Sequence, residues 1–139
     1  MNRELIVWPV LFQIGLTIVL YIRLARAKKR AAALNEVDEG RRSLYDDAWP
    51  DYVIQINNCI RNQFEVPVLF YVLTVLLYLL DAVTYLTLVL AWAFVLLRIG
   101  HAYVHTGTNY VPVRRKLFMA SVFTTLGLFV LCVYAVLVG

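Results

Sequence analysis

Four apolar segments of transmembrane length constrain this chain more than any other feature of its sequence. They cover residues 5–24, 53–80, 83–104 and 117–138 of the 139 residues. About 20 apolar residues in a helix are enough to cross the hydrocarbon layer of a bilayer. Hydrophobic residues make up 62% of the chain and its mean hydropathy is +0.73, which exceeds what a soluble domain of this size could bury. The sequence therefore predicts an all-α integral membrane protein, a four-helix bundle formed by one domain over residues 1–139.

The basic residues predict how this bundle is oriented in the membrane. They concentrate in and beside the first and third connections: Arg23, Arg26, Lys28, Lys29, Arg30, Arg41, Arg42, Arg98, Arg114, Arg115 and Lys116. Cytoplasmic connections carry the excess of Lys and Arg. Residues 25–49 should thus form a cytoplasmic loop, solvated or with a short helix, and both termini should lie outside. The net charge of +4 then reflects topology and anionic lipid neighbours, and it does not indicate nucleic acid binding.

The first apolar segment is predicted to remain in the protein as a helix. It lacks the positively charged start and the small-residue cleavage site of a signal peptide. Short outer connections fit a bacterial inner membrane or an endoplasmic-reticulum-type membrane. No eukaryotic retention signal stands at Val138 and Gly139, which favours the bacterial inner membrane.

A polar block from Asn58 to Pro67 stands within the second apolar segment and is the first candidate for function. It contains Arg61 and Glu65, and a charge at the bilayer centre costs about 2.5–3.5 kcal/mol on insertion scales. Asn58, Arg61 or Asn62, and Glu65 recur at spacings of three and four, which places them along one stripe of a helix.

A second polar stripe on the third helix contains Arg98, His101 and His105. If the two stripes face each other, Arg61, Glu65 and Arg98 can satisfy one another and leave donors free for a ligand. A buried ionic network can also set helix packing without binding anything. The residue types alone do not distinguish a ligand-binding site from a network that only sets helix packing.

Neither a metal site, a haem nor a disulfide is predicted. His101 and His105 could reach one metal together, but a zinc site needs three or four ligands and no suitable cysteine is expected nearby. Haem would need opposing axial ligands, which one helix cannot supply. Cys59 should lie near the cytoplasmic end of its helix and Cys132 near the outer end of the fourth, roughly 20 Å apart in depth. Both are expected to be packing residues.

Three motifs on three successive helices carry a family resemblance. They are Arg61-Asn62-Gln63-Phe64-Glu65 followed by Pro67, Arg98-Ile99-Gly100-His101 followed by Gly107, and Val111-Pro112-Val113-Arg114. With the four-helix length, they resemble the MAPEG family, the membrane-associated proteins in eicosanoid and glutathione metabolism. The resemblance covers most of the chain, and Arg23 matches a family arginine more weakly.

This resemblance implies a homotrimer that binds glutathione, as a co-substrate, between subunits near the cytoplasmic face. It assigns the glutathione site to Arg23, Arg61, Asn62, Glu65, Arg98, His101, His105 and Arg114. Arginines can pair the two carboxylates of glutathione and Glu65 can accept from its ammonium. Arg114 matches an arginine near the thiol in catalytic members, where a cation lowers the thiol pKa.

The implied chemistry is a glutathione transferase or peroxidase reaction on a lipophilic electrophile that arrives from the bilayer. Tyr103, Tyr110 and Phe118 could shape the lipid-side half of the pocket, although interfacial aromatic residues also serve as simple anchors. Prostaglandin E synthase-like members have tyrosines at His105 and Phe118 and a serine at Arg115. That particular synthase activity is therefore not expected.

Two other function classes compete with a glutathione-dependent enzyme. One is a noncatalytic lipid-binding or partner-presenting scaffold, as in the five-lipoxygenase-activating branch of the same family. The other is a transporter or channel, which is disfavoured because the charged stripes gather at one membrane face and line no path across it. The enzyme is the first expectation and the scaffold the second.

Overall fold

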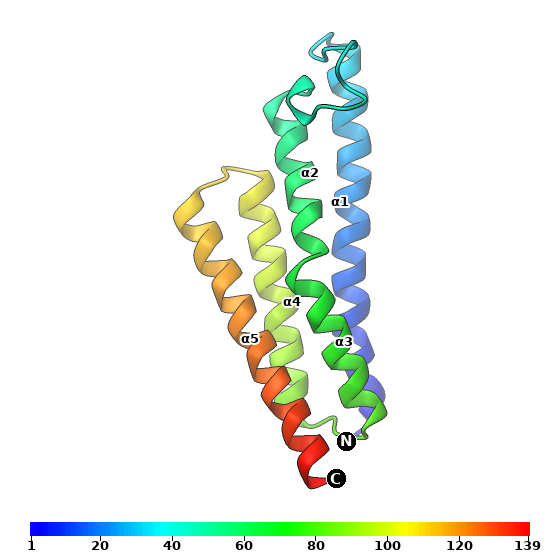
Figure 1. Ribbon diagram of the computed structural model, residues 1–139, viewed down its shortest axis with the longest axis vertical. Coiled ribbons are helices and arrows are strands. Elements are labelled where there is room, and N and C mark those ends of the chain that lie inside the picture. The colour runs from blue at the N-terminus through cyan, green and yellow to red at the C-terminus, as the bar shows by residue number, and fades with distance from the viewer.

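The computed structural model describes all 139 residues as a helical bundle without strands. Its elements in order are η1 (Arg3–Ile6), α1 (Val7–Ala33), η2 (Asp46–Ala48), α2 (Asp51–Gln63), α3 (Val66–Leu79), α4 (Tyr85–Thr106) and α5 (Val111–Val138). Four stretches are long and apolar enough to cross a membrane, with α2 and α3 together forming the second. Both termini lie at the same end of the elongated bundle, as an even number of spans requires (Figure 1). The predicted all-α architecture with four spans is confirmed.

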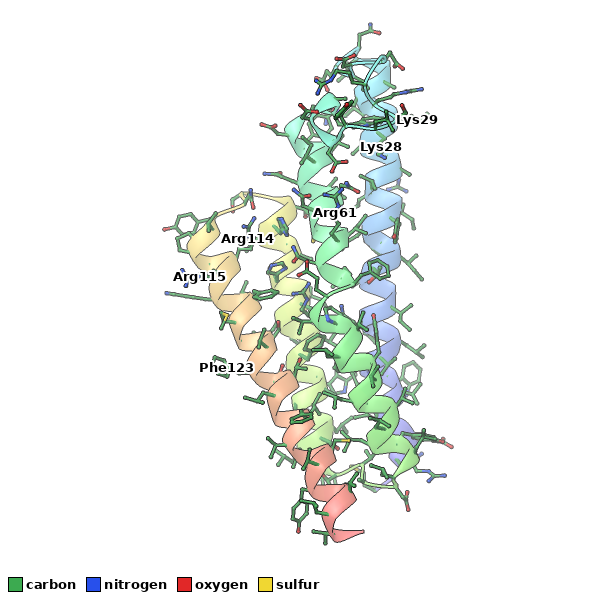
Figure 2. All side chains as sticks on the ribbon, in the orientation of Figure 1. Lys28, Lys29, Arg61, Arg114, Arg115 and Phe123 are labelled. Atoms are coloured by element: carbon green, nitrogen blue, oxygen red, sulfur yellow. The ribbon has the colours of Figure 1, made fainter.

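Two helices are longer than their apolar segments predicted. The helix α1 continues to Ala33, and α5 begins at Val111 with Pro112 in its first turn. Arg, Lys and Ala are good helix formers, so a drop in hydropathy ends the apolar segment without ending the helix. As a result, the basic residues beside the first connection lie on α1, and Arg114 and Arg115 lie in the first turns of α5 (Figure 2).

The second span is broken, whereas the sequence predicted one helix over residues 53–80. The helix α2 ends at Gln63 and α3 begins at Val66, with Glu65 between them at φ −102° and ψ −105°. Pro67 has no N–H group, so the carbonyl of Gln63 loses the donor that a continuous helix would supply. The break falls inside the polar block that contains the candidate binding residues.

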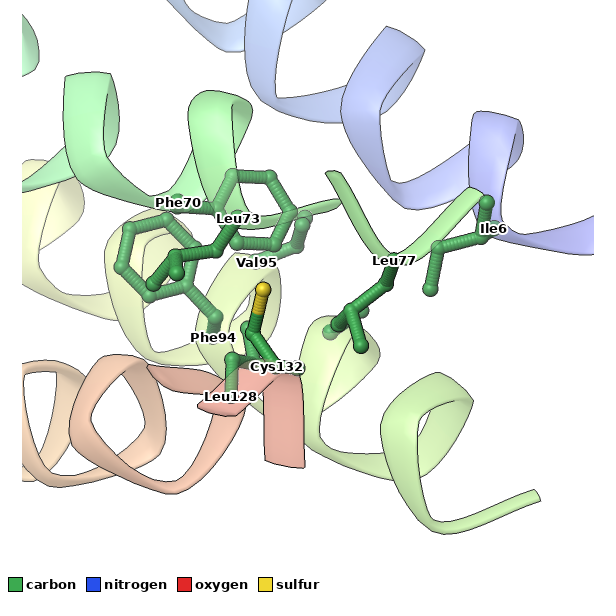
Figure 3. Packing of buried hydrophobic residues seen from close by; sticks show 9 residues of the cluster. Ile6, Phe70, Leu73, Leu77, Phe94, Val95, Leu128 and Cys132 are labelled. Atoms are coloured by element: carbon green, nitrogen blue, oxygen red, sulfur yellow. The ribbon is translucent and has the colours of Figure 1, made fainter. Parts of the chain in front are cut away.

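The hydrophobic core lies between α3, α4 and α5 in the half of the bundle nearer the termini. Phe70 and Phe94 stack there with ring centroids 4.3 Å apart, and Leu77, Leu128 and Cys132 pack around them (Figure 3). Cys132 is thus a packing residue, as expected. The outer faces of the helices remain strongly apolar, and this surface suits contact with lipid or with other subunits.

A second hydrophobic cluster joins α1 to α2 in the other half of the molecule and contains Cys59. At its edge, the Gln13 side chain donates to Gln63 Oε1 over 3.0 Å, and both residues are buried. Hydrogen bonds between buried amides hold helices together where lipid supplies no hydrophobic drive. This bond anchors the end of α2 directly before the break.

Candidate functional site

A polar cavity of about 270 Å³ opens between α2, α4 and α5, beside the break in the second span. Its lining residues are Asn62, His101, Val111, Arg114, Arg115 and Phe118. The cavity lies in the half of the bundle away from both termini, where Arg114 and Arg115 stand at the start of α5 (Figure 2). Three helices therefore bring together residues from all three of the family-like motifs.

Arg98 adjoins this cavity and is fully buried. Its Nη2 donates to the backbone carbonyl of Asn62 over 3.1 Å, and its guanidinium lies 5.9 Å from the centre of the Phe118 ring. The Nε and Nη1 groups have no hydrogen-bond partner. A buried cation with unused donors is costly unless an anion or further acceptors satisfy it. This arrangement is suited to binding a carboxylate.

His101 and His105 lie one turn apart on α4, with their ring centroids 5.3 Å apart in an edge-to-face arrangement. Both are buried, and neither Nδ1 atom has a hydrogen-bond partner. His101 lines the cavity and His105 does not. Cys59 of α2 joins them, with the ligand atoms of the three residues all within 4.8 Å of one another. The expectation that no cysteine would lie near this histidine pair is wrong, because α2 packs with its Cys59 face against α4.

Arg114 is half-buried in the cavity wall and donates to Oδ1 of Asn109. Asn109 has a positive φ of 54°, and it turns the chain from α4 into α5. Arg115 also lines the cavity, although it was not among the binding residues predicted from the sequence. The helical spacing of Val111, Arg115 and Phe118, at four and three residues, is the signal that could have revealed it.

Arg61 and Glu65 do not pair with each other or with Arg98. Arg61 forms an exposed ion pair with Asp46 in η2, and Glu65 is exposed and has no ion-pair partner. The mutual pairing of the three charged residues, which facing stripes would have allowed, is therefore not formed within one chain. The break at Glu65 removes the helical spacing on which the prediction depended. Arg23 joins α1 to the end of α4, where its Nη1 donates to Thr106 Oγ1 over 2.7 Å.

The proposed lipid-side residues are separated in the structure. Phe118 lines the cavity, whereas Tyr103 is 80% exposed and Tyr110 is 59% exposed, and neither lines it. A distinct apolar groove of about 350 Å³ runs between α3 and α5. It is lined by Val66, Leu69, Val72, Leu73, Val122, Thr125, Leu126 and Phe129. This groove was not predicted from the sequence, since each of its lining residues is common in membrane helices.

Comparison with known protein families gives one match. A family model described as the MAPEG family matches residues 6–134, which include the four spans almost completely and the three motifs. No curated protein and no solved structure matches the chain at a significant level.

Proposed function

Because the chain belongs to the MAPEG family, whose members are membrane proteins of glutathione and eicosanoid metabolism, we propose that it binds glutathione and transfers it to lipophilic electrophiles. Reduction of lipophilic peroxides is the closely related variant of this activity. The observation that carries the proposal is Arg98, a fully buried arginine with two unpartnered donor groups beside a polar cavity.

The charges around the cavity match those of glutathione. Arg98, Arg114 and Arg115 bring three cations to it, while glutathione offers two carboxylates and, when ionised, a thiolate. Arginine pairs carboxylates through two parallel hydrogen bonds, which favours it at such sites. In the proposed complex, the Phe118 ring moves aside so that a carboxylate reaches the free donors of Arg98.

Two residues at the break can recognise the glutathione ammonium. The Asn62 side chain donates through Nδ2 to the Asn58 carbonyl over 3.2 Å, which leaves its Oδ1 able to accept. Glu65 has no ion-pair partner, and its carboxylate can accept from the same ammonium. Arg61 is assigned to the solvent-facing edge of the site. There its guanidinium would bind a glutathione carboxylate in place of its exposed ion pair with Asp46.

Arg114 is assigned the catalytic role. A guanidinium beside a thiol lowers the thiol pKa and increases the thiolate fraction. The bound thiolate supplies the nucleophile, which attacks an electrophilic carbon or a peroxide oxygen. Arg114 is held in the cavity wall by Asn109, so its orientation is set before the ligand binds.

The proposal includes a homotrimer with the cavity at the cytoplasmic face and the termini outside. The cavity end carries the basic residues in and beside the first and third connections, in agreement with the excess of Lys and Arg on cytoplasmic sides. If glutathione binds at the boundaries between subunits, Arg23, Tyr103 and Tyr110 would lie beside a neighbouring chain. A bacterial inner membrane remains the proposed location.

A lipid-binding scaffold without catalysis is the second candidate. The apolar groove between α3 and α5 favours it, because this groove could hold an acyl chain whether or not glutathione binds. The same groove would deliver the lipophilic substrate in the enzymatic case. The enzyme and the scaffold can therefore be distinguished by whether the protein binds glutathione.

Thermal-shift and calorimetric titration with glutathione tests the proposal. The detergent-purified protein would be compared with Arg98→Ala and Arg61→Ala, and with Arg3→Ala as a matched control. Arg3 forms an exposed ion pair with Asp81 at the opposite end of the bundle. A ligand selective for the folded state raises its apparent stability.

We expect saturable binding in the wild type and in Arg3→Ala, and its loss in both cavity-side variants. Conjugation of a hydrophobic electrophile would then establish catalysis. Absence of binding at millimolar glutathione by folded wild-type protein would overturn the proposal and leave the scaffold as the better account.

A further inference from the structure

Cys59, His101 and His105 form a buried cluster next to the proposed glutathione site, and they share His101 with the cavity lining. Their ligand atoms lie within 4.8 Å of one another, although Cys59 comes from α2 and the histidines from α4. The three side chains are 0%, 2% and 5% exposed. Such a convergence of one thiol and two imidazoles has the composition of a metal site.

The hydrogen bonding of the cluster points independently to a ligand. The Nδ1 atoms of His101 and His105 are buried and unpartnered, and a buried polar atom without a partner is unfavourable. The contact of the Cys59 sulfur with Gln63 Nε2, at 3.9 Å, is long. A metal ion coordinated through Nδ1 of both histidines would satisfy these two atoms together.

We propose that Cys59, His101 and His105 bind a single monovalent copper ion. Three ligands suit a trigonal copper site, whereas structural zinc sites have four side-chain ligands and this cluster provides three. A catalytic zinc ion can also have three side-chain ligands with a water in the fourth position, but it is divalent. Binding converts the Cys59 thiol and Cu⁺ into a copper thiolate and releases one proton to the solvent. The product is neutral, whereas a divalent ion would leave a net positive charge close to the buried Arg98.

The geometry allows this site with small movements. With metal–nitrogen bonds of about 2.0–2.1 Å and a metal–sulfur bond of about 2.3 Å, ligands of a trigonal site are about 3.5–3.8 Å apart. The ligand atoms, now within 4.8 Å of one another, must therefore approach by up to about 1.3 Å. Gln63 would orient the cysteine from outside the ligand set, since Gln13 fixes its amide over 3.0 Å.

Anaerobic titration of the reduced, detergent-purified chain with Cu⁺ tests the inference. A chromophoric copper chelator would compete for the ion and report the copper retained per chain. Glutathione is omitted because its thiol also binds Cu⁺, so copper binding is measured whether or not the protein binds glutathione. The variants are Cys59→Ser and His105→Gln, with Cys132→Ser as the matched control. Cys132 is the other buried cysteine and lies in the core of α3, α4 and α5.

We expect one copper per chain in the wild type and in Cys132→Ser. Both ligand variants should lose more affinity than the roughly 10- to 100-fold typical of changes outside the ligand set. X-ray absorption of the wild-type complex should show two nitrogens and one sulfur, which tests the site even if a variant misfolds. Retention of copper by folded Cys59→Ser, or one-to-one binding of zinc without copper, would overturn the proposal.

Discussion

Arg98 donates to the backbone carbonyl of Asn62 over 3.1 Å, and this bond joins α4 to the break between α2 and α3. In a continuous helix the Asn62 carbonyl would accept from the backbone of Val66. The break releases that carbonyl, and the arginine takes the place of the missing donor. Irregular backbone inside a membrane is tolerated where it is buried in protein or lines a cavity. Here Asn62 lines the cavity directly before the break, which links the distortion of the second span to the candidate site.

Replacement of Arg98 by methionine should weaken glutathione binding and leave the free energy of unfolding nearly unchanged. Methionine keeps a long flexible side chain in the core and removes a buried cation that has two unpartnered donors. The Asn62 carbonyl loses its partner, which costs about 1–3 kcal/mol, while removal of the desolvated charge offsets this cost. We expect a change in unfolding free energy within about 2 kcal/mol and at least a 10-fold loss of glutathione affinity. Unfolding titrations and calorimetry on one preparation measure both quantities. If the Arg98→Met variant failed to fold, Arg98 would instead have a structural role.

Glu65→Gln should weaken glutathione binding and leave the assembly unchanged. The carboxylate is exposed and has no ion-pair partner in the chain, so its charge is not needed for helix packing. The neutral amide is a poorer acceptor for an ammonium. Glu4→Gln, at the opposite end of the bundle, is the matched control. Calorimetry gives the affinity and light scattering gives the oligomer size. Dissociation of the oligomer without ligand would contradict the prediction.

Arg114→Gln should reduce turnover more than it reduces glutathione affinity. Arg114 lines the cavity, and its proposed task is to increase the thiolate fraction of the bound thiol. The variant should therefore recover activity as the pH rises, because a higher pH ionises the thiol without the arginine. Stopped-flow absorbance of the thiolate over a pH series measures this directly. Lys116→Gln is a nearby exposed control outside the cavity lining, and a similar pH profile in both variants would count against the assignment.

The Gln13 and Gln63 pair should show measurable coupling between α1 and α2. Gln63→Leu removes the 3.0 Å interhelical bond and leaves the buried Gln13 amide without its partner, at about 1–2 kcal/mol. The double change to leucine should recover part of that loss, since neither amide is then unsatisfied. A double-mutant cycle of unfolding in detergent gives the coupling energy. Additive losses within about 0.3 kcal/mol would show that the bond does not stabilise the bundle.

Much of the architecture follows from local chemistry that a sequence displays. Hydropathy alone places four spans, because the bilayer requires about 20 apolar residues in each. The positions of the three motifs, and with them the family, are also readable along the chain. Arg114 and Asn62 could be selected as cavity residues on this basis.

Other features depended on how the helices pack. The predicted polar stripe required one continuous helix across residues 53–80. The helix is instead interrupted before Pro67, so Glu65 does not lie on the same helical face as Arg61. The meeting of Cys59 with His101 and His105 joins residues about 40 positions apart, which helical spacing within one element cannot reveal. The membrane class, the number of spans and the family could be predicted from the sequence, since these depend on composition and local order. The three-dimensional packing determined which polar groups are buried, satisfied or left unpartnered, because that depends on contacts between helices.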